Sequence, residues 1–166
     1  MASKAEVSSF CPSLAWIFHK GSQEPCGEWN AMKLIVFERQ SGTMSQKLYD
    51  FSLRRRRIGG CLFFRDLQDL TEYLKVFSRT PRILVVLGAD RELFREPEWK
   101  RGLAGFLDEI ALILVLSDHT SESVAEGHRM RPRYLSFMDE DADDLLMVLD
   151  GIIDSSAARA GEHAAD

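Results

Sequence analysis

The sequence predicts an α/β fold: a doubly wound, five-stranded parallel sheet with strand order 2-1-3-4-5. Five short apolar segments follow one another along the chain, and each precedes a segment whose apolar residues recur every three or four positions. The apolar segments are continuous rather than alternating, which indicates strands covered on both faces. Right-handed crossovers between such strands place helices on both sides of the sheet.

The five expected strands are compact runs of Ile, Leu, Val and Phe. They span residues 33–37, 61–64, 83–87, 111–116 and 134–137. We expect Gly59 and Gly60 to end the helix before the second strand, and Gly88 to end the third strand. At this size, the strand order 2-1-3-4-5 is the flavodoxin-like arrangement.

Each expected helix combines an apolar stripe with a start signal. The first helix is expected at residues 40–56 with Ser41 or Thr43 as N-cap, and the second from Leu67 to Phe77 after Asp66. The third is expected within 93–109, beginning near Pro97, and the fourth at 121–130. The fifth begins after Asp141 or Asp143 and continues through Ile153.

Regular patterning begins abruptly at Met32. Residues 1–31 contain scattered Ser, Gly and Pro and two isolated tryptophans, so we expect a flexible N-terminal appendage there. The sequence therefore predicts one domain over residues 32–155 and a small, polar, disordered tail over 156–166.

Composition excludes several classes of protein. A chain of 166 residues with 45% hydrophobic content can bury one core, and no apolar run reaches the roughly 18–20 residues that span a bilayer. The net charge of −5 argues against a general nucleic-acid binder. Cys11, Cys26 and Cys61 form no metal-ligand or disulfide pattern, and Cys61 is expected to be a small buried hydrophobe. No continuous apolar segment follows the N-terminus, so we expect no signal peptide and a cytoplasmic protein.

The ends of the expected strands carry the candidate functional residues, because ligands of doubly wound sheets bind beyond the carboxyl ends of the strands. Phe37 and Glu38 end the first strand and Gly88 the third. Ser117 follows the fourth strand and Phe137 ends the fifth.

This layout resembles the receiver domain of bacterial two-component response regulators, over residues 32 to about 155. Active receivers carry an acidic pair that holds Mg²⁺, a phospho-accepting Asp, a hydroxyl and a Lys at these strand ends. The resemblance puts Phe37 and Glu38 at the acidic pair, Gly88 at the acceptor, Ser117 at the hydroxyl and Phe137 at the Lys.

Three charged groups of that site are therefore missing. Mg²⁺ rarely binds through a single carboxylate, and a transferring phosphoryl group would meet no cation. The chain thus resembles a pseudo-receiver: a stand-alone domain that is neither phosphorylated nor an enzyme and holds no cofactor or metal. Asp90, two residues beyond Gly88, is an alternative acceptor if its loop is shifted. We also hypothesise that Phe37, Gly88 and Phe137 compensate one another, with Phe137 packing toward Phe37.

The resemblance implies a protein partner in bacterial signalling, such as a histidine kinase or another signalling protein. It places partner or homodimer contacts on residues 121–154, with no role for nucleic acid or membrane. Residues 139–166 carry a net charge of −8 and residues 1–138 a net charge of +3. This separation of charge is compatible with electrostatic steering of a protein partner. Four consecutive arginines at residues 54–57 either bind an acidic partner or form the solvent-exposed last turn of a helix, where positive charge complements the helix dipole. The acids of residues 139–144 fit the start of a helix, where negative charge complements the dipole, better than they fit a calcium-binding loop.

A second function remains open on the same fold. A small flavodoxin-like enzyme or ligand-binding protein would use the crevice at the strand ends near Ser117. An anion bound at Ser117 would indicate that function, whereas a crevice closed by Phe37 and Phe137 would indicate an interaction domain. A single glycine after the first strand argues against a phosphate-binding loop there.

Overall fold

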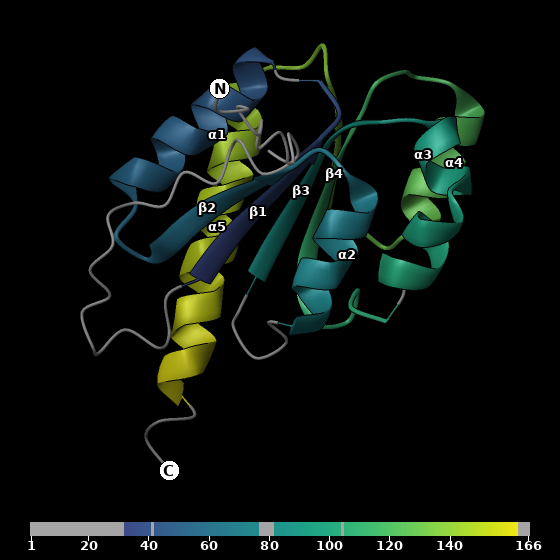
Figure 1. Cartoon of the computed structure of the whole chain (residues 1–166). Helices are drawn as coiled ribbons and strands as arrows, with labels where there is room; N and C mark the ends of the chain where they lie inside the picture. Colours follow the sequence, from purple (N-terminus) through teal and green to yellow (C-terminus); the bar gives the residue numbers. More distant parts are fainter. Residues whose placement is uncertain (1–31, 41, 77–81, 104, 163–166) are drawn as a thin grey trace, which may run out of the picture.

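A central parallel sheet organises the computed structural model, which describes residues 32–40, 42–76, 82–103 and 105–162 (Figure 1). The strand order is β2-β1-β3-β4-β5, so the predicted α/β fold and its order are confirmed. The strands are β1 (Met32–Glu38), β2 (Ile58–Phe64), β3 (Arg82–Ala89), β4 (Ile110–Leu116) and β5 (Tyr134–Phe137).

Helices cover both faces of the sheet. They are α1 (Thr43–Arg54), α2 (Leu67–Val76), α3 (Arg91–Arg95), the π-helical segment η2 (Trp99–Leu103), α4 (Ser121–Arg129) and α5 (Ala142–Glu162). Helices α1 and α5 lie on one face, and α2, α3 and α4 lie on the other (Figure 1). No helix in the described ranges is long and apolar enough to cross a bilayer.

Alternate residues of the central strands supply two cores. Leu34, Val85 and Ile113 face α1 and α5, where they pack with Leu48 and Leu149. The other face packs against the second helix layer through a separate cluster. That cluster includes Ile35, Phe37, Leu84, Val86, Leu112 and Leu114 with Leu70, Leu93, Trp99 and Leu103. Burial on both faces explains why the strands read as continuous apolar runs.

Several predicted boundaries were wrong for identifiable reasons. Gly59 and Gly60 lie inside β2 rather than ending α1, because the Met32 amide donates to the Arg57 carbonyl and strand pairing starts at Ile58. The N-cap of α1 is Gly42, not Ser41 or Thr43.

The segment after β3 also differs from the prediction. Helix α3 begins at Arg91, well before Pro97, because the Asp90 carboxylate accepts a hydrogen bond from the Leu93 amide at 2.7 Å. At the other end of the chain, α5 continues to Glu162, so residues 156–162 are helical where a disordered tail was expected. The expected appendage at residues 1–31 lies outside the described residues.

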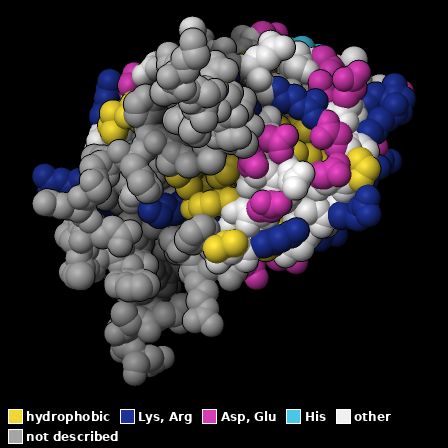
Figure 2. Space-filling view, in the orientation of Figure 1, with side chains coloured by type: hydrophobic (Ala, Val, Ile, Leu, Met, Phe, Trp, Pro, Cys, Tyr) yellow, Lys and Arg dark blue, Asp and Glu magenta, His cyan; other side chains and the backbone are white. Residues whose placement is uncertain are grey.

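Two of the four consecutive arginines bind the last helix. Arg57 Nη1 lies 2.7 Å from Asp154 Oδ1, Arg55 pairs with Asp150, and Lys47 Nζ lies 3.3 Å from Asp143 Oδ1. These exposed pairs join the side of α1 to α5, and each contributes at most about 1 kcal/mol. Over the α2–α3–α4 side, acidic and basic side chains are interspersed (Figure 2).

We predict that a chain beginning at Met32 folds without residues 1–31. The reason is that β1 takes its strand pairing from β2 and β3, both inside the described domain. Urea unfolding of the full and shortened chains should differ by less than about 2 kcal/mol. A larger loss would show that Trp16 or Trp29 packs on the core, since burying one large aromatic contributes about that much.

Candidate functional site

The predicted site residues meet at the carboxyl edge of the sheet. Glu38 pairs with Leu87 at the ends of β1 and β3, and Ala89 pairs with Leu116 at the ends of β3 and β4. The strand order therefore sets Glu38, Gly88, Ser117 and Phe137 side by side across four neighbouring strands. These residues therefore lie at the same edge, as expected, and what the edge can do chemically depends on the surroundings of each side chain.

Gly88 has a left-handed backbone, with φ of +68°. It interrupts the register with β4, where Leu87 and Ala89 pair with successive residues and Gly88 is left out as a bulge. A Cβ built on Gly88 would meet no atom within 4 Å, so space does not exclude a side chain. The backbone conformation does disfavour one, because left-handed L residues are strained.

Glu38 is the one acidic side chain that β1 brings to this edge, and it is buried with 6% of its surface exposed. Burial raises the pKa of its carboxyl, while a hydrogen bond from Ser45, the charge of Arg65 and the Gly42 amide oppose that rise. Ser45 also bonds the Gly42 carbonyl at 2.7 Å, so the carboxyl rests against the start of α1. Glu38 is therefore tied to the first turn of that helix.

Ser117 and Asp90 are both engaged by the backbone around them. The Ser117 amide donates to the Ala89 carbonyl at 2.9 Å, and its hydroxyl donates to the same oxygen at 3.4 Å. Asp90 caps α3 through Leu93. The carboxylate of Asp90 is therefore bonded to the start of α3.

Phe137 stacks on His119, with ring centroids 3.8 Å apart and planes inclined by 19°. His119 Nε2 lies 3.0 Å from both carboxylate oxygens of Asp139, and this interaction lowers the pKa of the Asp139 carboxyl. The loop after β4 is thereby joined to the loop after β5. The sequence held no periodic signal for this pair, because the two residues meet only through strand order.

The expected packing of Phe137 toward Phe37 is wrong. Strands β3 and β4 stand between β1 and β5, which puts β1 and β5 about 14 Å apart at the usual spacing of neighbouring strands. Phe37 is 1% exposed in the core, and Phe137 packs only partly against the same hydrophobic cluster. The two rings therefore lie apart at this edge of the sheet.

Asp118, which follows Ser117 after β4, is a further acid at this edge and is bonded to the start of α4. The Thr120 amide and hydroxyl donate to Asp118 Oδ1 at 2.9 and 2.5 Å, and the Ser123 hydroxyl donates to Oδ2 at 3.1 Å. The Thr120 hydroxyl is the main cause of the lowered pKa of Asp118. Asp118 is thus committed to the start of α4.

Within the described ranges, no three His, Cys, Asp or Glu side chains are placed to hold a metal ion. Cys61 is buried elsewhere, as expected, and burial raises the pKa of its thiol to about 12. Neither of two cavities on the molecule, about 590 and 270 Å³, is lined by Glu38, Gly88 or Ser117.

We predict that Gly88→Ala lowers the free energy of unfolding by about 1–2 kcal/mol through backbone strain alone. Gly151→Ala is the matched control, because its Cβ also meets no atom within 4 Å but lies on the exposed side of α5. That variant should gain about 1 kcal/mol from helix propensity. Urea unfolding measures both, and effects of equal sign would contradict the assigned backbone conformation.

Sequence comparison gives no match to any protein-family model or curated protein. Structural comparison does find matches. A response regulator receiver protein from Pseudomonas putida superposes with a TM-score of 0.53 at 13% identity, covering 74% of this chain and 97% of that one.

Two further structures match at a TM-score of 0.50. One is a putative pilus assembly-related protein from Burkholderia pseudomallei, at 17% identity over 78% of this chain and 95% of that one. The other is the signal receiver domain of a modulated diguanylate cyclase from Desulfovibrio desulfuricans, at 14% identity over 76% and 97%. The chain therefore has a receiver-like fold.

Proposed function

We propose that this chain is a stand-alone pseudo-receiver that acts in bacterial signal transduction through protein contacts, without phosphorylation or catalysis. The observation that carries the proposal is Gly88, which occupies the acceptor position of a receiver-like fold with a left-handed backbone. The functional unit is the domain over residues 32–155, working in the cytoplasm. Residues 1–31 are an appendage to it.

The chemistry of the edge supports the absence of phosphorylation. Phosphoryl transfer needs a nucleophile together with cations that meet the developing charge. Here Glu38 is a single buried carboxyl, and Phe137 stands where the resemblance expects a Lys. Asp90 holds a helix terminus, so its carboxylate already has a structural partner.

The proposed partner surface lies on residues 121–154, from α4 through α5. Strand β5 is at the edge of the sheet, and Met138 and Met147 are 40% and 68% exposed. Methionines adapt to varied partner surfaces, because their side chains are unbranched and polarisable. The proposed occupant is a signalling protein such as a histidine kinase, or a second copy of this chain. Nucleic acid and membrane are not proposed partners.

We predict no covalent phosphate after incubation of the full chain with acetyl phosphate and Mg²⁺, as measured by intact mass. The expected reason is the missing nucleophile at Gly88. Asp90→Asn is the control variant, because Asn keeps the N-cap while removing the carboxylate. An adduct that forms on the natural chain and vanishes in this variant would establish Asp90 as a shifted acceptor.

A second test addresses the surface. Met147→Lys should abolish binding of a captured partner, or a self-association seen by light scattering, because it puts a charge in the proposed contact. Val76→Lys is the matched control, with 72% exposure on α2 in the opposite layer, and it should bind normally. Equal binding by both variants would remove the assignment of this face, and saturable binding of a small anion at Ser117 would favour the ligand-binding alternative.

A further inference from the structure

Strand β2 is an outermost strand of the sheet, so it pairs with β1 alone among the described strands. The register between the two strands is regular from Gly60 to Phe64, which pair with Lys33 to Phe37. The backbone N–H and C=O groups of β2 that point away from β1 have no strand partner in the described ranges. Five residues of extended backbone can therefore pair with a further strand.

The other outermost strand, β5, is protected in ways that β2 is not. Strand β5 is four residues long, and Arg131, Pro132 and Arg133 precede it. Short length, proline and charge are the features that usually keep an outer strand from pairing. Strand β2 is seven residues long and contains no charged residue and no proline. Of the two, β2 is the strand suited to accept another strand.

Aromatic side chains lie on both faces of β2. On one face the ring of Phe63 is 6.4 Å from that of Tyr49 in α1, and on the other the ring of Phe64 is 5.3 Å from that of Tyr73 in α2. Leu53 is one helical turn beyond Tyr49 on the same side of α1, and 42% of its surface is exposed. The apolar layer beside β2 therefore extends to an exposed side chain.

Leu62 is the large apolar residue of β2 that the core does not use. It is half-buried and, in the described part of the chain, belongs to neither hydrophobic cluster. It pairs with Ile35, whose side chain is on the α2 face, so Leu62 points to that face together with Gly60 and Phe64. A strand laid along β2 would contact this side chain.

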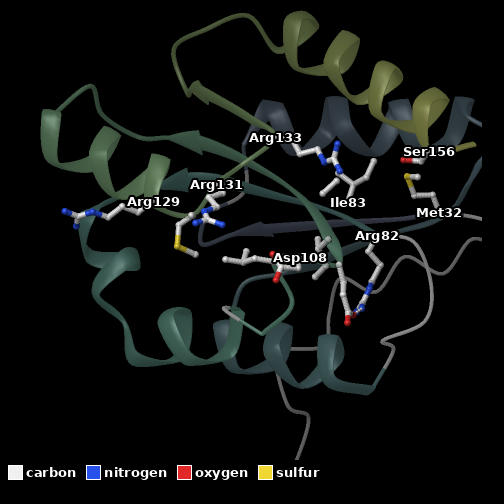
Figure 3. A pocket seen from close by; sticks show the side chains of 13 residues that line it. Met32, Arg82, Ile83, Asp108, Arg129, Arg131, Arg133 and Ser156 are labelled. Carbon is white, nitrogen blue, oxygen red and sulfur yellow. Dashed lines mark ion pairs between the residues drawn. The ribbon is translucent and has the colours of Figure 1, made fainter. Parts of the chain in front are cut away.

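Residues 58–64 line neither of the two cavities of the molecule. The larger cavity is at the amino edge of the sheet and is lined from the starts of β1, β3 and β4 and from residues after α4 (Figure 3). The smaller one lies among α3, η2 and α4. The outer side of β2 therefore suits pairing with an extended strand better than binding of a small ligand.

The sequence of β2 complements itself when two copies run antiparallel. Its amino half is small, with Gly-Gly-Cys, and its carboxyl half is large, with Leu-Phe-Phe. A two-fold axis perpendicular to the sheet must pass through a residue, because opposed residues of antiparallel strands point to the same face. With the axis at Leu62, Phe64 of each copy lies opposite Gly60 of the other, and Phe63 lies opposite Cys61. The large side chains then cover the small ones.

The charges that flank β2 favour the same register. An axis at Cys61 would place Arg57 of one copy opposite Arg65 of the other, and directly opposed like charges are destabilising. An axis at Leu62 places Arg65 opposite Gly59 instead.

We propose that two copies of this chain pair antiparallel through β2, with the two-fold axis at Leu62, and form one continuous sheet. Such a contact is isologous, since each copy contributes the same strand. Strands β2 and β5 are at opposite ends of the strand order, so this pairing leaves residues 121–154 to the signalling protein. It therefore adds a contact to the proposed function and does not depend on it.

Analytical ultracentrifugation of the full chain should show a monomer–dimer equilibrium. Leu62→Lys and Leu62→Glu should each weaken association about 10-fold or more, because the axis brings two like charges together. Leu62→Met is the matched control, which keeps an apolar side chain of similar volume and should associate as the natural chain does. Leu53→Lys, at an exposed position, should also weaken association and serves if the first two variants do not fold.

An equal mixture of the Leu62→Lys and Leu62→Glu variants should recover association, because opposite charges then meet across the axis. Recovery requires position 62 of one copy to meet position 62 of the other, so it is specific to this register. A mixture that associates no better than either variant alone overturns the proposal.

Three other results would also overturn it. One is a natural chain that stays monomeric up to about 1 mM. In that monomer, protection of the outer β2 amides from hydrogen exchange would show that another part of the chain covers β2, and exchange of those amides would leave β2 to a different protein. Another is dissociation by Met147→Lys but not by Leu62→Lys, which would place the second copy on residues 121–154. The third is unchanged association of folded Leu62→Lys and Leu53→Lys variants.

Discussion

The pairing of β3 on both of its edges is the constraint on which the rest of the structure depends. It bonds to β1 on one side and to β4 on the other, and Ile83 through Val86 are at most 1% exposed. A strand buried on both faces and both edges must be apolar throughout its length. Its two departures from that rule, Arg82 and Gly88, lie close to its two ends, one at each edge of the sheet.

Much of the fold could be predicted, because the buried strands are continuous apolar runs and the helices carry an apolar residue every three or four positions. The strands and their order follow from continuous apolar runs, and α2, α4 and α5 start at or within one residue of their expected positions. The boundaries that failed depend on interactions outside the local pattern. Two adjacent glycines predict a break at Gly59 and Gly60, but pairing with β1 holds them in β2. Asp90 rather than Pro97 starts the third helical segment.

The candidate site was predictable in position and less so in detail. Topology alone placed Glu38, Gly88, Ser117 and Phe137 at one edge. The left-handed backbone at Gly88 and the stacking of Phe137 on His119 depend on a bulge and on loop contacts that no periodic pattern encodes. The burial of Arg82 could not be predicted, because an arginine that follows a proline is typical of a surface loop. In the fold, Arg82 is buried and donates to the Leu74 carbonyl near the end of α2.

The acidic end of the chain has a different meaning in the structure than in the sequence. Asp150 and Asp154 pair with Arg55 and Arg57, while Asp139 holds His119. Part of the charge that looked available for steering a partner is therefore used to fasten α5 and the β5 loop to their neighbours. Long-range attraction weakens when a charge is matched nearby, since the pair acts at distance as a dipole. The proposed contact on residues 121–154 must then draw its strength more from exposed apolar side chains such as Met147 than from net charge, and a partner chosen that way is selected by shape and burial.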